Sequence, residues 1–466
     1  MVNRIVTVNV ATQVAPTPST LQQTGALISQ GGTTTAVNTL SFLTQLSDLT
    51  ALLVTPKAIT SMVWAGNVVT VTTTVAHGLT NAGVFTLAIA GVTPAAYNGT
   101  FSCTVTGTTT FTYPLTPNPG AVTVQGTWQP QSAIEVRQMA TTFFAQGSSV
   151  GVYVLEFGIG TSAAGVTALT SFITANPNTI YSYLTPRSWG SETTYPTFLA
   201  NYTSPTAKTY FFTTVTSANY TNFSGIDPKC LFLLVEAPAV PPLDNAASTE
   251  FTTASAFHVP LAYAPSSAQQ VTPTAYSFLY GVTPWPPANN NSTLANYSSL
   301  DINYVATGAE GGLSTSVLYY GKLNDGNDFT YWYSVDWVQI NCDTAISNAI
   351  INGSNNPQAP LYYNKAGINV LQSVVVATMK SAIGNGLALG TLTQTTLPAA
   401  QFTANLEQGM YEGQVVVNAE PFLAYSNENP GDYAIGNYAG LSVAYTPARG
   451  FLTIVFNITV SNFVAI

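Results

Sequence analysis

The sequence predicts a multidomain protein of mixed α+β and α/β class, with a central β-α-β body, an inserted small all-β sandwich and strand-forming N- and C-terminal arms. Three observations support this fold class. Helix-like and strand-like segments alternate after Trp128, residues 59–128 form short runs rich in Thr and Val, and apolar residues alternate along 452–460. Alternating helices and strands indicate a sheet covered by helices, whereas regularly spaced short strands indicate a sandwich or barrel.

The N-terminal residues 1–20 are predicted to form an arm. Ile5–Val10 is a short β-prone run, and a loose stretch rich in Ala, Pro, Thr and Ser follows it. Such a terminus is ordered only where something ties it down. From Asn38 to Leu53 leucines recur at three-to-four spacing, which predicts a helix with one apolar face. These leucines are Leu40, Leu43, Leu46, Leu49, Leu52 and Leu53.

The segment 59–128 differs sharply in composition from the rest of the chain. No charged residue occurs between Lys57 and Glu135, and turn residues separate the strand-like runs. This pattern predicts a small all-β sandwich or barrel inserted into the chain. The expected strands cover 61–64, 68–75, 84–89, 101–105, 111–113 and 122–128.

Helices and strands alternate after Trp128. Ser132 and Glu135 have the spacing of a capping box, which predicts a helix running to about Gln146. A second apolar helical face covers 166–173. Further helices are expected over 197–202, 336–351 and 367–383, and strands over 150–155, 179–184, 210–215, 231–235, 302–305, 317–322, 414–417, 441–444 and 452–464.

Composition and charge exclude several classes of function. Only 6% of the 466 residues are charged, yet no run approaches the roughly 18 apolar residues of a membrane-spanning helix. Ten Lys and Arg residues against nineteen acidic ones cannot neutralise a row of phosphates, which argues against binding to nucleic acid or to an anionic membrane. The start lacks the apolar core of a signal peptide, and three widely spaced cysteines form no disulfide framework, so we expect a reduced, cytoplasmic chain.

No group of residues has the pattern of a catalytic or metal site. His77 and His258 are far apart, and the acidic turn 324–328 lacks the spacing of a calcium loop. Asp336 and Asp343 are expected on one helix as caps or hydrogen-bond anchors. The segment 147–151 matches GxSxG, but a helix enters a strand there instead of the reverse. Cys103 and Cys230 are expected to be buried. We therefore predict no enzyme, no cofactor and no metal.

Several stretches resemble, in the right order, the contractile-phage (myovirus-type) tail sheath proteins. They are the opening, with Ile5–Val10 and Leu40–Leu53; the helix from Ser132–Glu135 through 140–144; the pair 319–322 and 334–339; and the turn 360–369 that enters a helix. The match spans most of the chain outside 59–128, which interrupts the family pattern as an inserted Ig-like module would. The turn carries Leu361-Tyr362-Tyr363 where the family has an Ile-Pro-Tyr-like triplet.

The resemblance implies the structural subunit of a helical contractile phage tail sheath, which surrounds a tail tube and contracts to drive it through the host envelope. The implied partners are further copies of the subunit, the tail tube protein, and the baseplate and tail terminator proteins, without nucleic acid or membrane insertion. The implied location is the phage tail of the virion, after assembly in the host cytoplasm. The alternative is a non-contractile virion protein: a tail tube, decoration or receptor-binding protein.

The expected organisation is an N-terminal arm (1–20), a sheath body (21–58 and 129–333), an inserted Ig-like domain (59–128), and a C-terminal domain (334–466) that ends in a strand arm (452–466). Strands at both ends leave unpaired main-chain groups unless they join a sheet, and we expect them to join sheets of neighbouring subunits. The arm residues are Ile5, Val6, Val8, Val10, Leu452, Ile454, Phe456, Ile458 and Val460.

Overall fold

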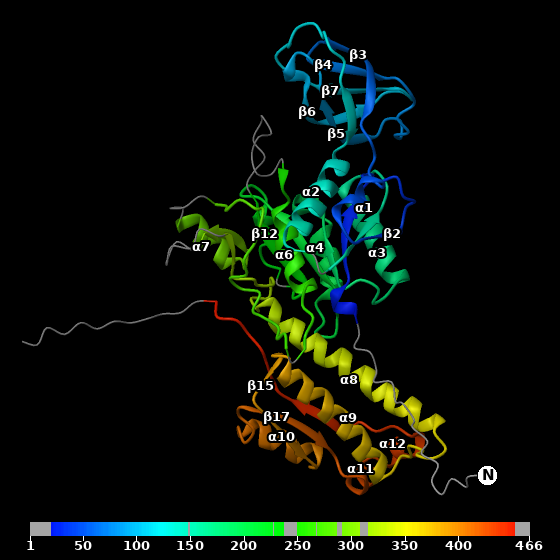
Figure 1. Ribbon diagram of the computed structural model, residues 1–466, viewed down its shortest axis with the longest axis vertical. Helices are drawn as coiled ribbons and strands as arrows, with labels where there is room; N and C mark the ends of the chain where they lie inside the picture. The colour runs from blue at the N-terminus through cyan, green and yellow to red at the C-terminus, as the bar shows by residue number, and fades with distance from the viewer. Residues whose placement is uncertain are drawn as a thin grey trace, which may run out of the picture. The chain divides into compact units, whose positions relative to one another are not determined.

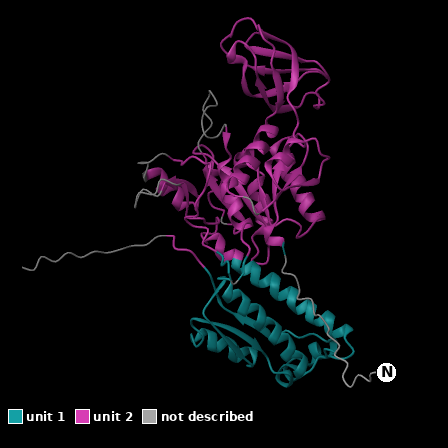
Figure 2. Ribbon diagram, in the orientation of Figure 1, with its two compact units in different colours: residues 1–20, 265–271, 334–448 teal, residues 21–264, 272–333, 449–466 magenta. Residues whose placement is uncertain are grey.

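The structure, a computed structural model, describes residues 20–147, 150–226, 228–236, 249–266, 268–286, 291–307 and 316–452 (Figure 1). The chain divides into two compact units, shown in teal and magenta in Figure 2. Unit 1 contains residues 1–20, 265–271 and 334–448, and unit 2 contains 21–264, 272–333 and 449–466.

A six-stranded sheet forms the centre of unit 2, with the strand order β12-β11-β10-β1-β9-β2. The first five strands in this order run parallel, and β2 closes the sheet as an antiparallel edge beside β9. The strands are β1 (Gly25–Ser29), β2 (Thr39–Leu43), β9 (Val152–Glu156), β10 (Ser182–Leu184), β11 (Tyr210–Val215) and β12 (Leu231–Val235).

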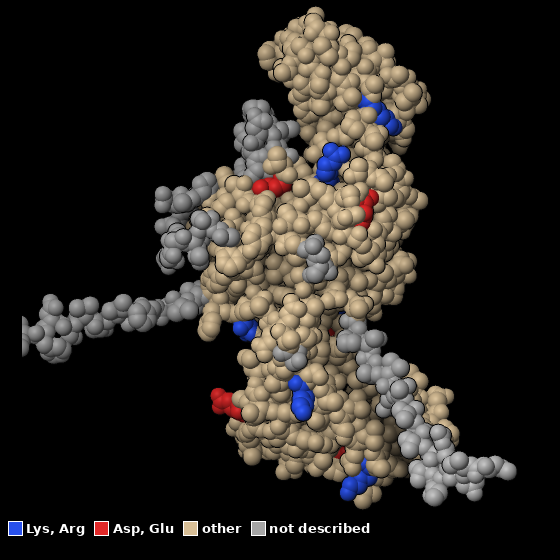
Figure 3. All heavy atoms as spheres, viewed as in Figure 1, with Lys and Arg blue, Asp and Glu red and all other residues tan. Residues whose placement is uncertain are grey.

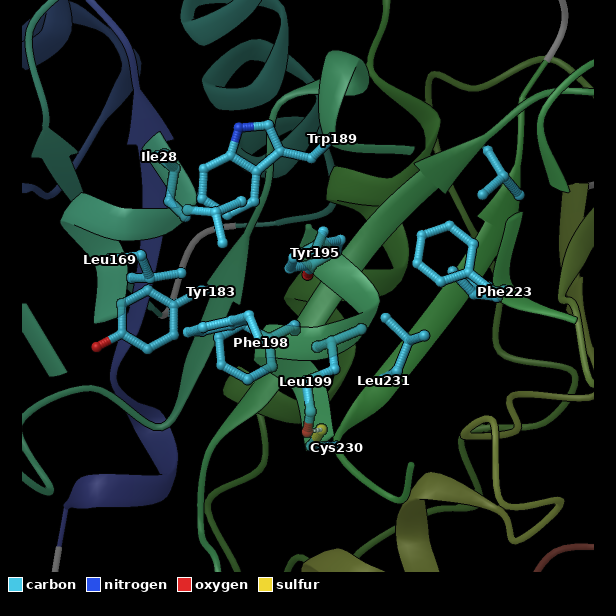
Figure 4. Close-up of a cluster of buried hydrophobic side chains, with 14 of the residues drawn as sticks. Ile28, Leu169, Tyr183, Trp189, Tyr195, Phe198, Leu199, Phe223, Cys230 and Leu231 are labelled. Atoms are coloured by element: carbon cyan, nitrogen blue, oxygen red, sulfur yellow. Dashed lines mark hydrogen bonds between the residues drawn. The ribbon is translucent and has the colours of Figure 1, made fainter. Parts of the chain in front are cut away.

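Both faces of this sheet are buried, as expected for parallel strands that carry nearly continuous apolar runs. Every residue of β1, β11 and β12 is buried. Phe211 packs on Phe198 at 5.1 Å between ring centroids, and the next residue, Phe212, packs on Phe257 at 5.2 Å on the opposite face. Figure 4 shows the cluster on the Phe198 side, where Tyr195 lies among apolar side chains.

The helices of unit 2 follow the strands in chain order and cover the sheet. They are α1 (Leu46–Thr50), α2 (Gln131–Ala145), α3 (Ser162–Ala175), α4 (Tyr195–Leu199), α6 (Thr252–Leu261) and α7 (Asn291–Ser299), with 3-10 turns at Leu21–Gln23, Ala95–Tyr97, Arg187–Ser191, Ala200–Tyr202 and Tyr220–Phe223. A two-stranded ribbon, β13 (Tyr304–Thr307) and β14 (Ser316–Tyr319), completes the unit.

The uncharged segment forms a closed six-stranded barrel, so the predicted small all-β module is present as a barrel and not as an Ig-like sandwich. The last strand, β8, pairs with both β3 and β5, and this double pairing closes the sheet. Of the expected strand 122–128, only the end from Thr127 onward belongs to a regular strand, β8. Before it, Val124 forms a single isolated bridge. The strands are β3 (Lys57–Ala65), β4 (Val68–Thr73), β5 (Val84–Ala90), β6 (Gly99–Val105), β7 (Thr110–Pro114) and β8 (Thr127–Pro130).

Unit 1 is built from helices and a small mixed sheet with the strand order β16-β17-β18. The helices are α8 (Phe329–Asn355), which begins in unit 2 and continues into unit 1, α9 (Lys365–Gly384), α10 (Ala399–Glu407), α11 (Phe422–Glu428) and α12 (Pro430–Ile435). The strands are β15 (Ala388–Leu389), β16 (Thr391–Thr395), β17 (Gln414–Ala419), β18 (Leu441–Ala444) and β19 (Thr446–Pro447).

Helix α9 is long and apolar enough by composition to cross a membrane, contrary to the expectation that no segment approaches that length. In unit 1 its buried residues include Ile368, Val375 and Met379. Gln372 on the same face donates hydrogen bonds to the carbonyl oxygens of Thr395 and Val417, at 2.7 and 3.1 Å. These contacts attach α9 to β16 and β17 as a core helix.

Two expected helix features are wrong. The leucine-rich segment from Asn38 to Leu53 is strand β2 followed by the short helix α1, because main-chain pairing with β9 takes up residues 39–43. Ser132 and Glu135 form no capping box, since α2 begins at Gln131 after Pro130. The Ser132 hydroxyl instead accepts a hydrogen bond from the backbone N–H of Gln30, and Glu135 accepts one from the N–H of Arg187.

A single buried carboxylate, Glu156 at the end of β9, holds the loop that leaves β1. Its oxygens accept hydrogen bonds from the hydroxyl of Ser29, the N–H of Gly31, and the N–H and hydroxyl of Thr33, at 2.6 to 3.0 Å. The N–H of Gly158 also donates to it, at 2.6 Å. Each donor would lose its partner without this carboxylate, and buried donors without partners are costly.

Replacing Glu156 with glutamine should destabilise unit 2. The amide of Glu156→Gln turns two hydrogens toward groups that are themselves donors, so we expect a loss of about 3 kcal/mol in the free energy of unfolding. Urea denaturation followed by tryptophan fluorescence measures this. The matched control is Glu412→Gln at an exposed position, with an expected change within about 0.5 kcal/mol. Equal stability of the two variants would contradict the role given to Glu156.

His258 gives unit 2 a defined pH dependence. Its ring lies buried in the last turn of α6, with Nε2 3.1 Å from the carbonyl oxygen of Gly147. Burial lowers the pKa of His258, and the Gly147 carbonyl opposes that effect. As the pH falls below about 6.5, the unfolded chain binds a proton at this residue more readily than the folded chain, so stability is lost.

We expect the free energy of unfolding to fall more steeply between pH 7.5 and 5.5 in the wild type than in His258→Gln, which retains an N–H for Gly147. Urea unfolding at each pH provides the comparison. Parallel pH profiles for the two proteins would show that His258 is not the group responsible.

Candidate functional site: open sheet edges and the anchored chain ends

Burial keeps the three cysteines protonated, and a main-chain contact holds His77 in place. Burial raises the pKa of Cys103 and of Cys230 to about 12 and that of Cys342 to about 11, and only a thiolate is a good nucleophile. His77 is buried, with Nε2 2.8 Å from the Gly107 carbonyl oxygen. Within the described ranges no three His, Cys, Asp or Glu side chains are placed to hold a metal ion.

The acidic turn has a structural role, and the two aspartates expected as caps or anchors lie inside α8 and not at its end. Residues 324–328 form a turn closed by a bridge between Lys322 and Asp328, as predicted, but the expectation of a solvated turn is wrong because Asn324 and Asp328 are buried. Asp328 accepts a hydrogen bond from the N–H of Thr330, so it caps the start of α8. Asp336 and Asp343 both lie on α8, as expected, and Asp336 is buried. The segment 147–151 lies partly outside the described residues.

One partly buried arginine, Arg187, collects the charged groups beyond β12. The guanidinium of Arg187 donates two hydrogen bonds of 2.8 Å to Glu236 and one to Gln138. Burial raises the pKa of Glu135, which the charge of Arg187 opposes, and burial also raises the pKa of Glu250. Because Arg187 bridges these groups, the cluster attaches α2 to the end of β12 and leaves no free carboxylate pair for acid–base chemistry.

The visible surface in Figure 3 carries few Lys, Arg, Asp or Glu side chains, and they are scattered. With ten basic residues in the whole sequence, this face has no positive stripe of the kind that binds phosphates. What the surface does offer is unpaired main chain at the edges of sheets.

The sheet of unit 1 has two edges that no described strand covers. β16 pairs only with β17, in parallel, and β18 pairs only with the other side of β17, antiparallel. No charged residue occurs between Lys380 and Glu407 or between Asp432 and Arg449. Exposed edges usually carry charges or proline that prevent pairing with another chain. Neither β16 nor β18 contains a charged residue or a proline.

The large sheet of unit 2 is less open. The main chain of Asn303 covers part of the β12 edge. The Asn303 N–H donates to the Leu233 carbonyl oxygen, and the Val235 N–H donates to the Asn303 carbonyl oxygen, each at 2.9 Å. At the other edge β2 pairs with β9 alone among the described strands. In the turn that follows β2, the Asp48 carboxylate accepts a hydrogen bond of 2.8 Å from the N–H of Thr44 and so fixes the turn.

Both chain ends leave unit 2 from anchored positions. At the N-terminal side, Gln22 donates to the carbonyl oxygen of Tyr333 and Gln23 to that of Tyr263, each at 3.0 Å. At the C-terminal side, the N–H of Gly450 donates to Asp328 at 2.7 Å, and the guanidinium of Arg449 lies 4.2 Å from the ring centre of Tyr331. These contacts fix where each end begins.

The predicted arm residues lie almost entirely outside the described residues. Leu452 is described, half-buried, with its carbonyl oxygen 2.6 Å from the hydroxyl of Tyr276. Sequence reasoning missed both the anchors and the acceptor edges. The long uncharged stretches around β16 and β18 were the available signal for the edges. Outside the described residues lie Ile5, Val6, Val8, Val10, Ile454, Phe456, Ile458 and Val460.

Comparison with known proteins gives a structural likeness only. No protein-family model matches the sequence, and no curated protein matches it. Among solved structures, the chain is similar to the helical sheath of the anti-feeding prophage in its contracted state, with a TM-score of 0.50 at 11% identity over 98% of this chain and 99% of that one. A sheath tail protein from Listeria innocua aligns at 9% identity with a TM-score of 0.41, over 91% and 94% of the two chains.

The first likeness spans essentially both full chains, so it concerns the whole arrangement of elements and not one common subdomain. This chain therefore has the fold of a tail sheath subunit, as the resemblance in its sequence implied.

Proposed function

We propose that this protein is the subunit of a helical sheath that surrounds and, on contraction, drives a tail tube, in a phage tail or a related injection system. The observation that carries the proposal is the sheath fold over 98% of the chain. The sheet of unit 1 supports it, because no described strand covers the outer edges of β16 and β18, which leaves these edges for self-association. Partners on this proposal are further copies, a tube protein, and the baseplate and terminator proteins of the particle.

The two chain ends are the proposed strand donors, and the sheet of unit 1 is the proposed acceptor. Each copy has two β-prone ends, Ile5–Val10 and 452–460, and two open edges, β16 and β18. A donor strand of one copy on an edge of the next makes a head-to-tail contact, which propagates into a helical lattice. About five main-chain hydrogen bonds at about 1 kcal/mol each stabilise such a strand, before the entropy of ordering it is subtracted.

Contraction on this proposal is a rearrangement of rigid subunits. The apolar core of unit 2 and the arginine cluster around Arg187 keep that unit intact, while the donated strands keep copies connected. A small free-energy difference per copy between two lattices then adds up over many identical copies.

The barrel is proposed as an accessory module on the outside of the sheath. Its first and last strands pair, with Lys57 opposite Trp128, so the chain enters and leaves the barrel at neighbouring positions. This arrangement suits an insertion that the body does not need for folding. Its own core, which includes Phe111, Tyr113 and Trp128, is buried within the barrel.

Lysines on the β16 edge should block assembly. Thr391→Lys with Gln394→Lys replaces two exposed residues of this strand, so we expect a folded subunit that forms no tubes, because charged edges resist strand addition. The matched control, Gln401→Lys with Gln408→Lys, adds the same charge to exposed positions on and beside α10. Negative-stain microscopy and sedimentation give the outcome. Normal tubes from the β16 variant, with the control also normal, would rule out this edge as an acceptor.

Removing the barrel should leave assembly intact. In a variant with residues 58–127 replaced by a short Gly-Ser linker, we expect the body to retain its cooperative unfolding and the protein to form tubes of unchanged inner diameter. Circular dichroism and electron microscopy make the comparison with the full chain. A folded variant that forms no tubes would place the barrel within the lattice contacts, and tubes with a wider inner diameter would place the barrel on the inside of the sheath.

A further inference from the structure

A row of exposed aromatic side chains follows the extended segment beside β14. Tyr276, Phe278 and Tyr280 are 43%, 51% and 51% exposed, whereas Leu279 between the last two is buried. The segment is held to β14 by hydrogen bonds from the N–H of Tyr276 to the Leu318 carbonyl oxygen and from the N–H of Leu279 to that of Ser316. We call Tyr276, Phe278 and Tyr280 the aromatic strip. Exposed aromatic residues at every second position mark a surface that something covers.

The C-terminal end of the chain begins at one end of the aromatic strip. Gly450 lies so close to the chain at Pro273 that a Cβ on it would be 2.7 Å from the Pro273 Cβ. Two residues later, the carbonyl oxygen of Leu452 accepts a hydrogen bond from the Tyr276 hydroxyl. Between these two contacts, residues 450–452 therefore run in the same direction as residues 273–276.

Tyr276 holds a strained conformation at this junction. Its φ is 61°, in the left-handed region that a bulky residue rarely adopts. The conformation accompanies edge-to-face packing of its ring on Tyr319, 5.4 Å between centroids, and the contact to Leu452. Strain of this kind persists where a specific contact requires it.

We propose that, in the unassembled subunit, the C-terminal residues 453–466 dock as an extended strand on the aromatic strip of their own chain. Fourteen residues follow Leu452, and apolar side chains recur at Ile454, Phe456 and Ile458. At about 3.3 Å per residue, Ile454 and Phe456 reach Phe278 and Tyr280 with the same two-residue spacing.

The occupant is the chain's own end because the tether favours it. Residue 453 directly follows the anchor at Leu452, so its effective concentration at the strip is in the millimolar range or above. A segment from another copy at micromolar concentration competes poorly. Gln146 limits the strip at its far end, where its side chain accepts from the N–H of Tyr280 and donates to the Tyr280 carbonyl oxygen.

Docking would restrain assembly, and this part rests on the proposed function. The same residues 453–460 serve as a donor strand in the sheath and as a cover for the aromatic strip in the free subunit. If about nine-tenths of free subunits are docked, the concentration of available donor ends falls about tenfold. Premature polymerisation is then slowed until a growing sheath captures the released end.

A photo-crosslinker at the chain end tests docking directly. p-Benzoylphenylalanine replaces Ile454 in the full chain, and equal amounts of ordinary and ¹⁵N-labelled protein are mixed at low concentration and irradiated. We expect adducts to residues 276–280 within chains of one label, and their loss in Phe278→Ser/Tyr280→Ser but not in the control Val63→Ser/Val84→Ser, which removes exposed apolar residues of the barrel. Adducts that join the two labels, or that lie elsewhere, would overturn the proposal.

Assembly of the same variants, with natural Ile454, tests the restraint. Phe278→Ser/Tyr280→Ser should form tubes at a concentration about tenfold below that of the wild type, and the barrel control should match the wild type. An unchanged threshold would overturn the restraint. If neither the wild type nor any variant forms tubes, the proposed sheath function fails, and the crosslinking result still decides docking.

Discussion

Main-chain hydrogen bonding at sheet edges is the constraint on which the rest of this molecule depends. With 6% charged residues, the chain lacks the side chains that usually keep exposed edges apart. The barrel meets the constraint by closing on itself through β8. In unit 2, Asn303 covers β12. In unit 1, no described strand covers the outer edges of β16 and β18, and these edges are the ones we propose as acceptors for a strand of another copy.

Because charged residues are scarce, a few of them each hold several segments of the chain in place through hydrogen bonds. Glu156 alone takes five hydrogen bonds and fixes the loop after β1. Arg187 gathers groups from α2 and from beyond β12. Asp328 both caps α8 and holds Gly450, so the start of the longest helix and the departure of the C-terminal end share one carboxylate. Unit 2 therefore gives both chain ends fixed departure points, which the proposed donation of end strands requires.

The sequence predicted elements whose pattern is local and missed those set by tertiary contacts. Strands β11, β12 and β18 were located well because their apolar runs are short and bounded. The central strand β1 was missed. Both of its faces are buried, so its sequence GALIS does not alternate between apolar and polar residues as a half-exposed strand does. The leucine repeat at 38–53 predicted a helix, but residues 39–43 form β2 because they pair with β9. Helix α6 was missed because its sequence, with Pro260 inside it, has no helical pattern. The anchors of the chain ends were unpredictable, because Gly450 and Asp328 meet only in the folded chain.

The central claim is that strands from the chain ends complete the unit 1 sheet of other copies. A cryo-electron microscopy reconstruction of tubes assembled from the purified full-length protein tests it most directly, at a resolution that traces the main chain around β16 and β18. The account predicts a helical lattice in which at least one of these two edges is hydrogen-bonded to an end segment from another copy. Tubes in which both edges remain bare, or in which both end segments pair within their own chain, would contradict it.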